Sequence, residues 1–148
     1  VWDERDGSWE LAASLKHGKK VTVAILDGAG NGLFADRFGD VYRWGLREDA
    51  EARLLLSHLA IVTAMVLTES RKFLVTGDNH ERIRVSCYPL AEEIHSFCLG
   101  HTGQITAVAP RGDEALVTAS ADGTLRLWNM DGTPAAALKL GSEVICLG

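Results

Sequence analysis

Short runs of alternating apolar and polar residues, separated by turn-forming residues, make up most of this chain. The last complete group has runs at 105–109, 115–119, 124–129 and 135–140. Asp122-Gly123 and Asp131-Gly132 follow the second and third of these runs, and Asp-Gly pairs suit hairpin turns that need positive φ. The same pattern occurs upstream, with runs near 21–26, 32–36, 41–46 and 53–56 and then near 60–67, 73–77, 82–88 and 93–98. The pattern predicts three successive groups of four β-strands.

Equivalent residues recur along the chain at a nearly constant spacing. Three series keep steps of 42 residues: Leu33, Val75 and Val117, then Val41, Ile83 and Leu125, then Trp44, Ser86 and Trp128. A fourth series, His17, His58 and His101, has steps of 41 and 43 residues, and each histidine precedes a pair of a β-branched residue and threonine: Val21-Thr22, Val62-Thr63 and Ile105-Thr106. A repeat of about 40 to 45 residues is typical of a β-propeller blade.

The repeat divides the chain into units at about 16–56, 57–98 and 99–140, with partial strands at both ends. A closed propeller has about four to eight blades, whereas the 148 residues of this chain hold about three and a half units. We therefore expect an all-β chain that is a fragment of a seven-bladed propeller. Val1-Trp2-Asp3 reads like the end of the third strand of a preceding unit.

The segment from Gly100 to Asn129 resembles a WD-repeat unit, with Gly100-His101 at its start and Asn129 in place of the usual Asp. The resemblance implies a structural tetrad, in which Asp orients His, His bonds Ser, and Ser bonds the Trp indole. The residues in those positions are His101, Ser120, Asp122 and Trp128. Ser, His and Asp could instead form a hydrolase triad. A triad needs an exposed nucleophile in a pocket, which nothing in the pattern indicates, so we favour the tetrad.

The composition narrows the class of function. Twenty acidic residues face fifteen Lys and Arg, and the pI is near 5.5, so the chain lacks the basic footprint of a nucleic-acid-binding domain. The longest apolar stretch, Leu54 to Leu67, is shorter than the roughly 20 residues that cross a bilayer. The N-terminal residues lack the cationic start and apolar centre of a secretory signal. We expect no membrane contact, and we expect any RNA to be held mainly by another chain.

Three other features have structural interpretations. Cys87, Cys98 and Cys146 are an odd number without CxxC spacing, so we expect packing residues and no metal site. The glycine-rich segment 27–32 lies between two strands, which favours a hairpin connection over a phosphate loop. Lys16, Lys19 and Lys20 surround His17. A solvated face is the ordinary interpretation of such a cluster, and contact with RNA or an acidic partner is the alternative.

The middle unit departs from the tetrad, since His80 occupies the usual Asp place and Ser86 the Trp place. Its segment 73–101 resembles the WD-repeat, non-catalytic subunit of eukaryotic tRNA (guanine-N7) methyltransferase, whose matching blade reads like LTADRDEKIRVSRYP before a run ending FCLGH. The matching residues are Leu74, Thr76, Asp78, Glu81, Ile83, Arg84, Val85, Ser86, Tyr88, Pro89, Ile94, Phe97, Cys98, Leu99, Gly100 and His101. The segment 34–44, FADRFGDVYRW, also looks like the preceding blade of that family, and the resemblance covers about residues 15 to 130.

The resemblance implies a scaffold with no catalytic residue of its own. Such a subunit binds and stabilises a separate methyltransferase subunit in a heterodimer in the nucleus, and that partner carries the S-adenosylmethionine and most of the tRNA contact. By motif position the partner-binding residues are Arg82 and Arg84, with Asp78 and Glu81 beside them. Asn79 and His80 stand where the family usually has Arg and Asp, which changes part of the polar contact that the resemblance implies.

Two less specific alternatives stay open at this point. The chain could be a general WD-repeat adaptor for protein interactions in another complex. Arg82 and Arg84 could simply project from alternate outward positions of a strand.

Overall fold

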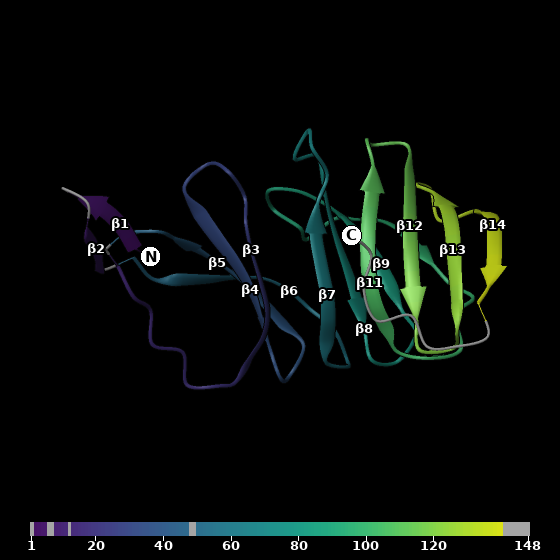
Figure 1. Cartoon of the computed structure of the whole chain (residues 1–148), viewed down its shortest axis with the longest axis horizontal. Helices are drawn as coiled ribbons and strands as arrows, with labels where there is room; N and C mark the ends of the chain where they lie inside the picture. Colours follow the sequence, from purple (N-terminus) through teal and green to yellow (C-terminus); the bar gives the residue numbers. More distant parts are fainter. Residues whose placement is uncertain (1, 6–7, 12, 48–49, 141–148) are drawn as a thin grey trace.

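The computed structural model describes residues 2–5, 8–11, 13–47 and 50–140, and within these ranges the chain is all-β (Figure 1). Three four-stranded antiparallel sheets follow one another along the chain, and we call them units 1, 2 and 3. Unit 1 contains β3 (Val21–Leu26), β4 (Asn31–Asp36), β5 (Asp40–Gly45) and β6 (Ala52–Ser57). Unit 2 contains β7 (Val62–Leu67), β8 (Phe73–Asp78), β9 (Ile83–Cys87) and β10 (Ile94–Cys98). Unit 3 contains β11 (Ile105–Arg111), β12 (Ala115–Ser120), β13 (Thr124–Asn129) and β14 (Pro134–Lys139).

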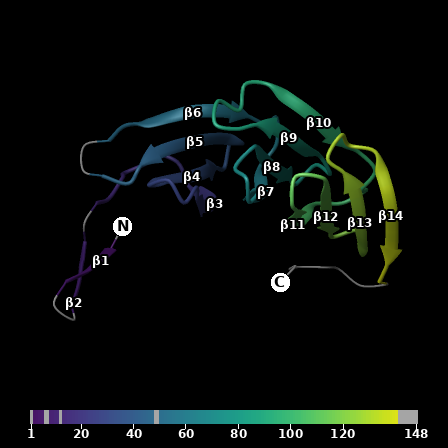
Figure 2. The same ribbon diagram turned by 90° about the horizontal axis from the view of Figure 1, so that it is seen from above.

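The strands within each unit are ordered as they occur in the sequence. Seen from above, the three units form an arc, with β3, β7 and β11 on the concave side and β6, β10 and β14 on the convex side (Figure 2). This arrangement is that of successive propeller blades, and it confirms the predicted fold class. The predicted strands lie within two residues of the observed ones, because alternation and turn residues mark the strand ends.

The two ends of the strands carry different connections. The turns β4–β5, β8–β9 and β12–β13 lie at one end, together with the connections between units, and we call this the lower end, as it is drawn in Figure 1. The hairpins β3–β4, β7–β8 and β11–β12 lie at the opposite, upper end. The hairpin predicted at 27–32 is the β3–β4 connection, which occupies residues 27–30 because β4 begins at Asn31. Asp27 stabilises it by accepting hydrogen bonds from the backbone N–H groups of Ala29 and Asn31.

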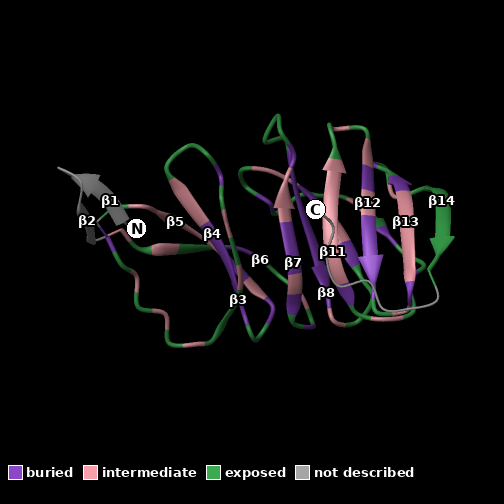
Figure 3. Cartoon of the chain, in the orientation of Figure 1, coloured by how far each residue is buried: buried purple, intermediate pink, exposed green. Residues whose placement is uncertain are grey.

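The core consists of two clusters, one between each pair of units. Between units 1 and 2, Leu33 and Val41 pack against Val62 and Leu74. Between units 2 and 3, the buried residues include Val75, Ile83, Val85, Ile105, Leu116 and Trp128. All six residues of β8 are buried, because this strand has a neighbouring unit on both faces (Figure 3). Packing between units therefore stabilises the arc.

The repeated threonines stabilise the contact between inner strands. The Thr22 hydroxyl donates to the Val62 carbonyl oxygen at 2.8 Å, and the Thr63 hydroxyl donates to the Ile105 carbonyl oxygen. Thr22 and Thr63 therefore each bond to the β-branched residue that precedes the equivalent threonine of the next unit. The sequence revealed this series, and the structure gives its physical reason.

The N-terminal residues and the cysteines complete the description. β1 (Trp2–Arg5) pairs with β2 (Ser8–Leu11) as an antiparallel hairpin, so the strand predicted to end near Asp3 continues to Arg5. Cys98 is fully buried and Cys87 half-buried, as packing residues should be, whereas Cys146 lies outside the described residues. The described part of the chain contains no helix that could cross a membrane.

Candidate functional site

Unit 3 contains a buried chain of hydrogen bonds. The Asp122 carboxylate lies 3.0 Å from His101 Nδ1, and His101 Nε2 lies 2.8 Å from the Thr118 hydroxyl. The Trp128 indole N–H donates to the same hydroxyl oxygen at 2.8 Å. These partners assign the proton of the neutral ring to Nδ1, so that Nε2 accepts from Thr118. Thr118 and Trp128 are fully buried, so each of these polar groups depends on its partner.

The prediction of Ser120 in this tetrad was wrong, because Thr118 supplies the hydroxyl. Both residues lie on the same face of β12, and Trp128 pairs with Leu116 in the sheet register, which places the indole beside Thr118. The Ser120 hydroxyl instead donates to the Gly103 carbonyl oxygen at 2.9 Å. Ser120 is fully buried and its hydroxyl does not bond to the histidine ring. The hydrolase triad therefore lacks the hydrogen bond between nucleophile and general base that it needs.

Unit 2 has a modified version of the same network. His58 bonds to Asp78 at 3.0 Å and to the Thr76 hydroxyl at 2.7 Å. Asp78 is the last residue of β8. It lies two positions before His80, which occupies the place that Asp122 has in unit 3. Arg84 occupies the space beside Ser86: its Nε donates to the Ser86 hydroxyl at 2.8 Å, and its Nη2 donates to the Ala91 carbonyl oxygen at 2.9 Å. Partial burial lowers the pKa of Arg84 because desolvation disfavours the charged form.

Unit 1 replaces the hydroxyl with an aromatic ring. Phe34 is at the place of Thr76 and Thr118, and it stacks on Tyr42 with 5.2 Å between ring centroids. His17 packs edge-on against both rings and bonds to Asp36 at 3.1 Å. The three units therefore share a His–Asp pair, while the third member of the network changes along the chain.

Burial makes the stability of the fold sensitive to acid. Desolvation lowers the pKa of His58 and His101 below 6.5, although Asp78 and Asp122 oppose the shift. Between pH 7 and 5 the unfolded chain therefore binds more protons than the folded chain. We expect the free energy of unfolding to fall as the pH drops through 6.5, by up to about 1.4 kcal/mol per pH unit for each histidine. Urea unfolding at pH 7.5, 6.5 and 5.5 measures this slope.

The carboxylate of Asp122 contributes little over this pH range. Although burial opposes the shift, hydrogen bonds from Thr124 and Thr102 lower the pKa of Asp122 well below 3.8, so its contribution is lost only in stronger acid. A His80→Gln variant is the control for the loss of a histidine side chain, because His80 is exposed on the β8–β9 turn. A free energy of unfolding that is constant from pH 7.5 to 5.5 would contradict the prediction.

The predicted partner-binding residues lie at and beside the β8–β9 turn, but only two of them are exposed. Glu81 and Arg82 project from the turn at the lower end. Asp78 is fully buried, and its carboxylate accepts the backbone N–H groups of His80 and Arg82 at 2.8 and 3.0 Å. Asp78 therefore has no exposed surface to offer a partner. Asp78 sets the shape of the turn, and Arg84 is half-buried with two bonds inside its own unit.

The turn lies beside a hollow between units 2 and 3. A pocket of about 570 Å³ is lined by His80, Glu81 and Arg82 from the turn and by Leu99, Gly100 and His101 from the connection to unit 3. Leu99 is 65% exposed. Protein interfaces have an apolar centre and a polar rim. An exposed leucine with exposed charges beside it has this composition.

The predicted lysine cluster lies in unit 1, at the same lower end as the β8–β9 turn of the neighbouring unit 2. Lys16 and Lys20 are exposed, whereas Lys19 lies 3.1 Å from Asp40 and 3.4 Å from Asp36. The hydrogen bond to Asp40 raises the pKa of Lys19. Two further residues here, Arg37 and Phe38, were missed by the sequence analysis. The signal that could have found them is a phenylalanine at the turn position where units 2 and 3 have His80 and Asp122.

Metal binding has no support in the described ranges. Within them, no group of three or more His, Cys, Asp or Glu side chains is placed to hold a metal ion.

A family described as "tRNA methyltransferase TRM82 WD40 domain" matches residues 46–144. The chain belongs to this family. The matched range includes all of unit 2 and unit 3, together with the β8–β9 turn and its pocket. The resemblance predicted from the sequence is thereby confirmed.

Curated relatives agree with the TRM82 WD40 assignment. A Drosophila pseudoobscura pseudoobscura protein named tRNA (guanine-N(7)-)-methyltransferase non-catalytic subunit wuho is 41% identical over 98 residues, which cover 66% of this chain and 25% of the relative. The Drosophila grimshawi protein of the same name is 43% identical over 98 residues, covering 66% of this chain and 26% of the relative. The chain therefore spans about a quarter of the length of these relatives.

Solved structures support the fold of this family member. The WD40 β-propeller domain of Doa1 superposes with a TM-score of 0.76 at 18% identity, covering 90% of this chain and 45% of that structure. The WD40 repeats of RRP9 superpose with a TM-score of 0.73 at 17% identity, covering 84% of this chain and 40% of that structure. At these identities the similarity establishes the propeller architecture alone.

Proposed function

We propose that this chain is part of a non-catalytic scaffold that binds and stabilises the catalytic subunit of a tRNA (guanine-N7) methyltransferase. The relatives are named non-catalytic subunits of that enzyme. In this proposal S-adenosylmethionine and the reacting guanine belong to the partner, and no residue of this chain takes part in the chemistry. A nuclear location accompanies the proposal, and fluorescence microscopy of the tagged protein in intact cells tests it.

The observation that carries the proposal is the exposed β8–β9 turn. Its backbone is held by Asp78, which accepts two N–H groups of the turn, and by Asn79, whose side chain accepts the Ile61 N–H at 3.0 Å. A turn fixed in this way loses little entropy when a partner binds. Glu81 and Arg82 then stand at fixed positions beside Leu99 and the pocket, where a protein surface can cover them.

Arg82 is a better docking residue than Arg84. Arg82 is exposed, whereas the Arg84 guanidinium already donates to Ser86 and Ala91. Arg84 therefore has a structural task inside unit 2. A charge reversal at Arg84 would remove both bonds from a half-buried site, so a loss of partner binding in that variant would report a change of fold.

The test is Arg82→Glu. Truncating an arginine that pairs with a carboxylate of the partner in a desolvated contact costs about 2 to 5 kcal/mol of binding free energy. The affinity of the full chain for the catalytic subunit should therefore fall about 30-fold or more. Co-purification and titration by isothermal calorimetry measure this loss. Methylation of tRNA by the co-expressed pair should fall with it.

Arg111→Glu is the matched control, because Arg111 is exposed at the upper end of unit 3. It changes the net charge by the same amount and should leave the affinity unchanged. Thermal unfolding of both variants should match that of the unaltered chain. A well-folded chain that does not bind the catalytic subunit would overturn the proposed function, and equal affinity of the Arg82→Glu variant would overturn the docking site.

A further inference from the structure

An exposed aromatic ring lies at the lower end of unit 1. Phe38, in the β4–β5 turn, has 57% of its surface exposed. The equivalent positions of units 2 and 3 hold His80 and Asp122, which are polar. A phenylalanine at the tip of a turn gains nothing for the core, and exposed aromatic side chains often belong to binding sites. The ring therefore calls for an explanation beyond folding.

Positive charge surrounds this ring. Lys19 Nζ lies 4.7 Å and the Arg37 guanidinium 5.1 Å from the ring centroid of Phe38. Lys16, Lys20 and Arg37 are exposed, and they form no ion pair with the described side chains. The nearby carboxylates of Asp36 and Asp40 are both occupied by Lys19. We call Lys20, Arg37 and Phe38 the Phe38 patch, and it is locally positive in a chain whose net charge is −5.

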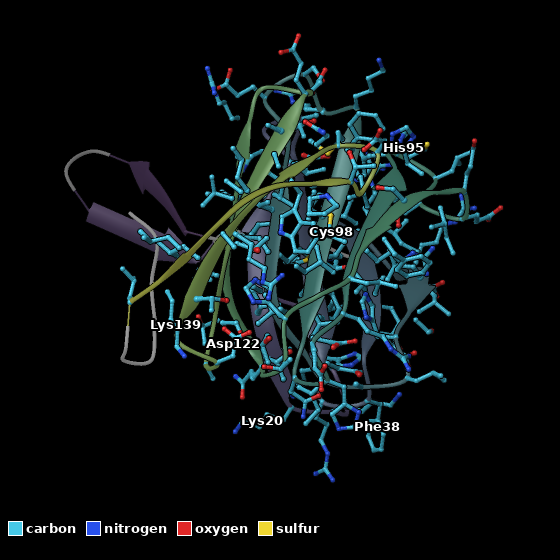
Figure 4. The ribbon with its side chains drawn as sticks, turned by 90° about the vertical axis from the view of Figure 1, so that its right-hand side faces the viewer. Lys20, Phe38, His95, Cys98, Asp122 and Lys139 are labelled. Atoms are coloured by element: carbon cyan, nitrogen blue, oxygen red, sulfur yellow. The ribbon has the colours of Figure 1, made fainter. Side chains whose placement is uncertain are left out.

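The backbone holds the Phe38 patch in place. The Arg37 N–H donates to the Lys20 carbonyl oxygen at 2.9 Å, which joins the turn to the segment before β3. The Asp36 carboxylate accepts the Phe38 N–H at 2.8 Å. Lys20 and Phe38 project at the same lower end of the molecule (Figure 4). Lys20, Arg37 and the ring therefore form one surface.

We propose that the Phe38 patch contacts the tRNA that the docked enzyme holds. Proteins that bind single-stranded nucleic acid combine exposed cations with an exposed aromatic ring. The Lys and Arg side chains bind phosphates, and a base stacks on the face of the ring. The Phe38 patch and the β8–β9 turn lie on neighbouring units at the same lower end. A partner docked at that turn would present its RNA beside unit 1. This inference rests on the proposed function.

The chemistry favours RNA over an acidic protein segment. Carboxylates of a protein would need only the cations, whereas the exposed ring adds a surface on which any base can stack. Most of the tRNA affinity would still come from the enzyme, because the chain as a whole is acidic. The Phe38 patch would add a few contacts that hold the RNA in register.

The experiment uses the complex of the full chain with its catalytic subunit and a fluorescently labelled tRNA, measured by anisotropy at two salt concentrations. Phe38→Ala should weaken tRNA binding about 5- to 100-fold, the range for loss of one stacked base. The Lys20→Ala, Arg37→Ala double variant should reduce the slope of log affinity against log salt by about one for each lost phosphate contact. Affinity between the subunits is measured in parallel and should not change.

Two control variants match the removed groups. Leu90→Ala removes an apolar side chain that is 58% exposed at the upper end, and Arg111→Ala removes an exposed arginine there. Both should bind tRNA as the unaltered complex does.

Each outcome decides the proposal. Unchanged tRNA binding in the Phe38→Ala and double variants would overturn it. Loss of subunit assembly in the same variants would also overturn it, since the patch would then be a protein-docking site. If the unaltered chain does not assemble with the enzyme, the proposed function fails, and the same titration of the chain alone with tRNA then tests the Phe38 patch separately.

Discussion

Replacing Thr118 with valine is expected to lower the free energy of unfolding by about 2 to 5 kcal/mol, because two buried polar groups lose their partner at once. Valine has nearly the shape of threonine, so packing changes little. The His101 ring nitrogen Nε2 and the Trp128 indole N–H would both be left unpaired beside it. Urea unfolding monitored by tryptophan fluorescence and by circular dichroism measures the change.

Ser120→Ala is the matched control for this prediction. Ser120 is as buried as Thr118, but its hydroxyl bonds to backbone groups of Gly103 and Asp122. Both of these residues are half-exposed, so water can replace the lost bonds, and we expect a cost of only about 1 to 2 kcal/mol. A larger effect for Ser120→Ala than for Thr118→Val would restore Ser120 to the tetrad and contradict the network described here.

Replacing Gly39 with alanine is expected to destabilise the fold by about 2 to 5 kcal/mol, in two parts. The φ angle of Gly39 is +89°, and this left-handed conformation costs an L-residue about 1 to 2 kcal/mol. A Cβ atom would also lie 2.4 Å from the Ala60 carbonyl oxygen and 2.8 Å from that of His58. Moving the turn away would cost about 1 to 3 kcal/mol more.

Gly30→Ala separates the two parts. Gly30 has nearly the same φ, +84°, but no atom lies within 4 Å of the position that a Cβ atom would take there. Its variant should therefore show the conformational cost alone, and chemical denaturation of the two variants side by side gives the difference. Because Gly39 adjoins Phe38 and the loop that carries His58, Gly39→Ala should also weaken tRNA binding by the complex. Equal losses of stability in the two variants would show that the loop at 58–60 yields freely to the new methyl group.

Gly39 and Trp128 both lie at contacts that link one unit to the next. Gly39 lets the β4–β5 turn of unit 1 contact the loop that leads into unit 2, and Trp128 packs into the cluster that unit 3 shares with unit 2. The proposed docking turn lies between these two contacts. A variant that loosens either contact would move the turn relative to its neighbours, so loss of partner binding has to be measured together with stability.

The strands and the repeat could be predicted from the sequence because they are local properties. Alternation, Asp-Gly pairs and the spacing of 42 residues depend only on residues close together or on their regular recurrence. The resemblance of the segment 73–101 to one family was also readable, because its motif is continuous in the chain. These features determined the propeller architecture, the three units and the position of the β8–β9 turn.

The tertiary structure decided which polar groups meet. His101 and Thr118 are 17 residues apart and Tyr88 and Asp27 are 61 apart, so their pairing depends on the register of strands and on the packing of one unit against the next. Thr118 and Ser120 share a face, and only the position of the Trp128 ring selects between them. In the same way, burial between units separated Arg82, which is exposed, from Arg84 and Asp78, which are held inside. Alternation along a strand assigns a residue to a face, but the neighbouring unit determines whether that face is covered.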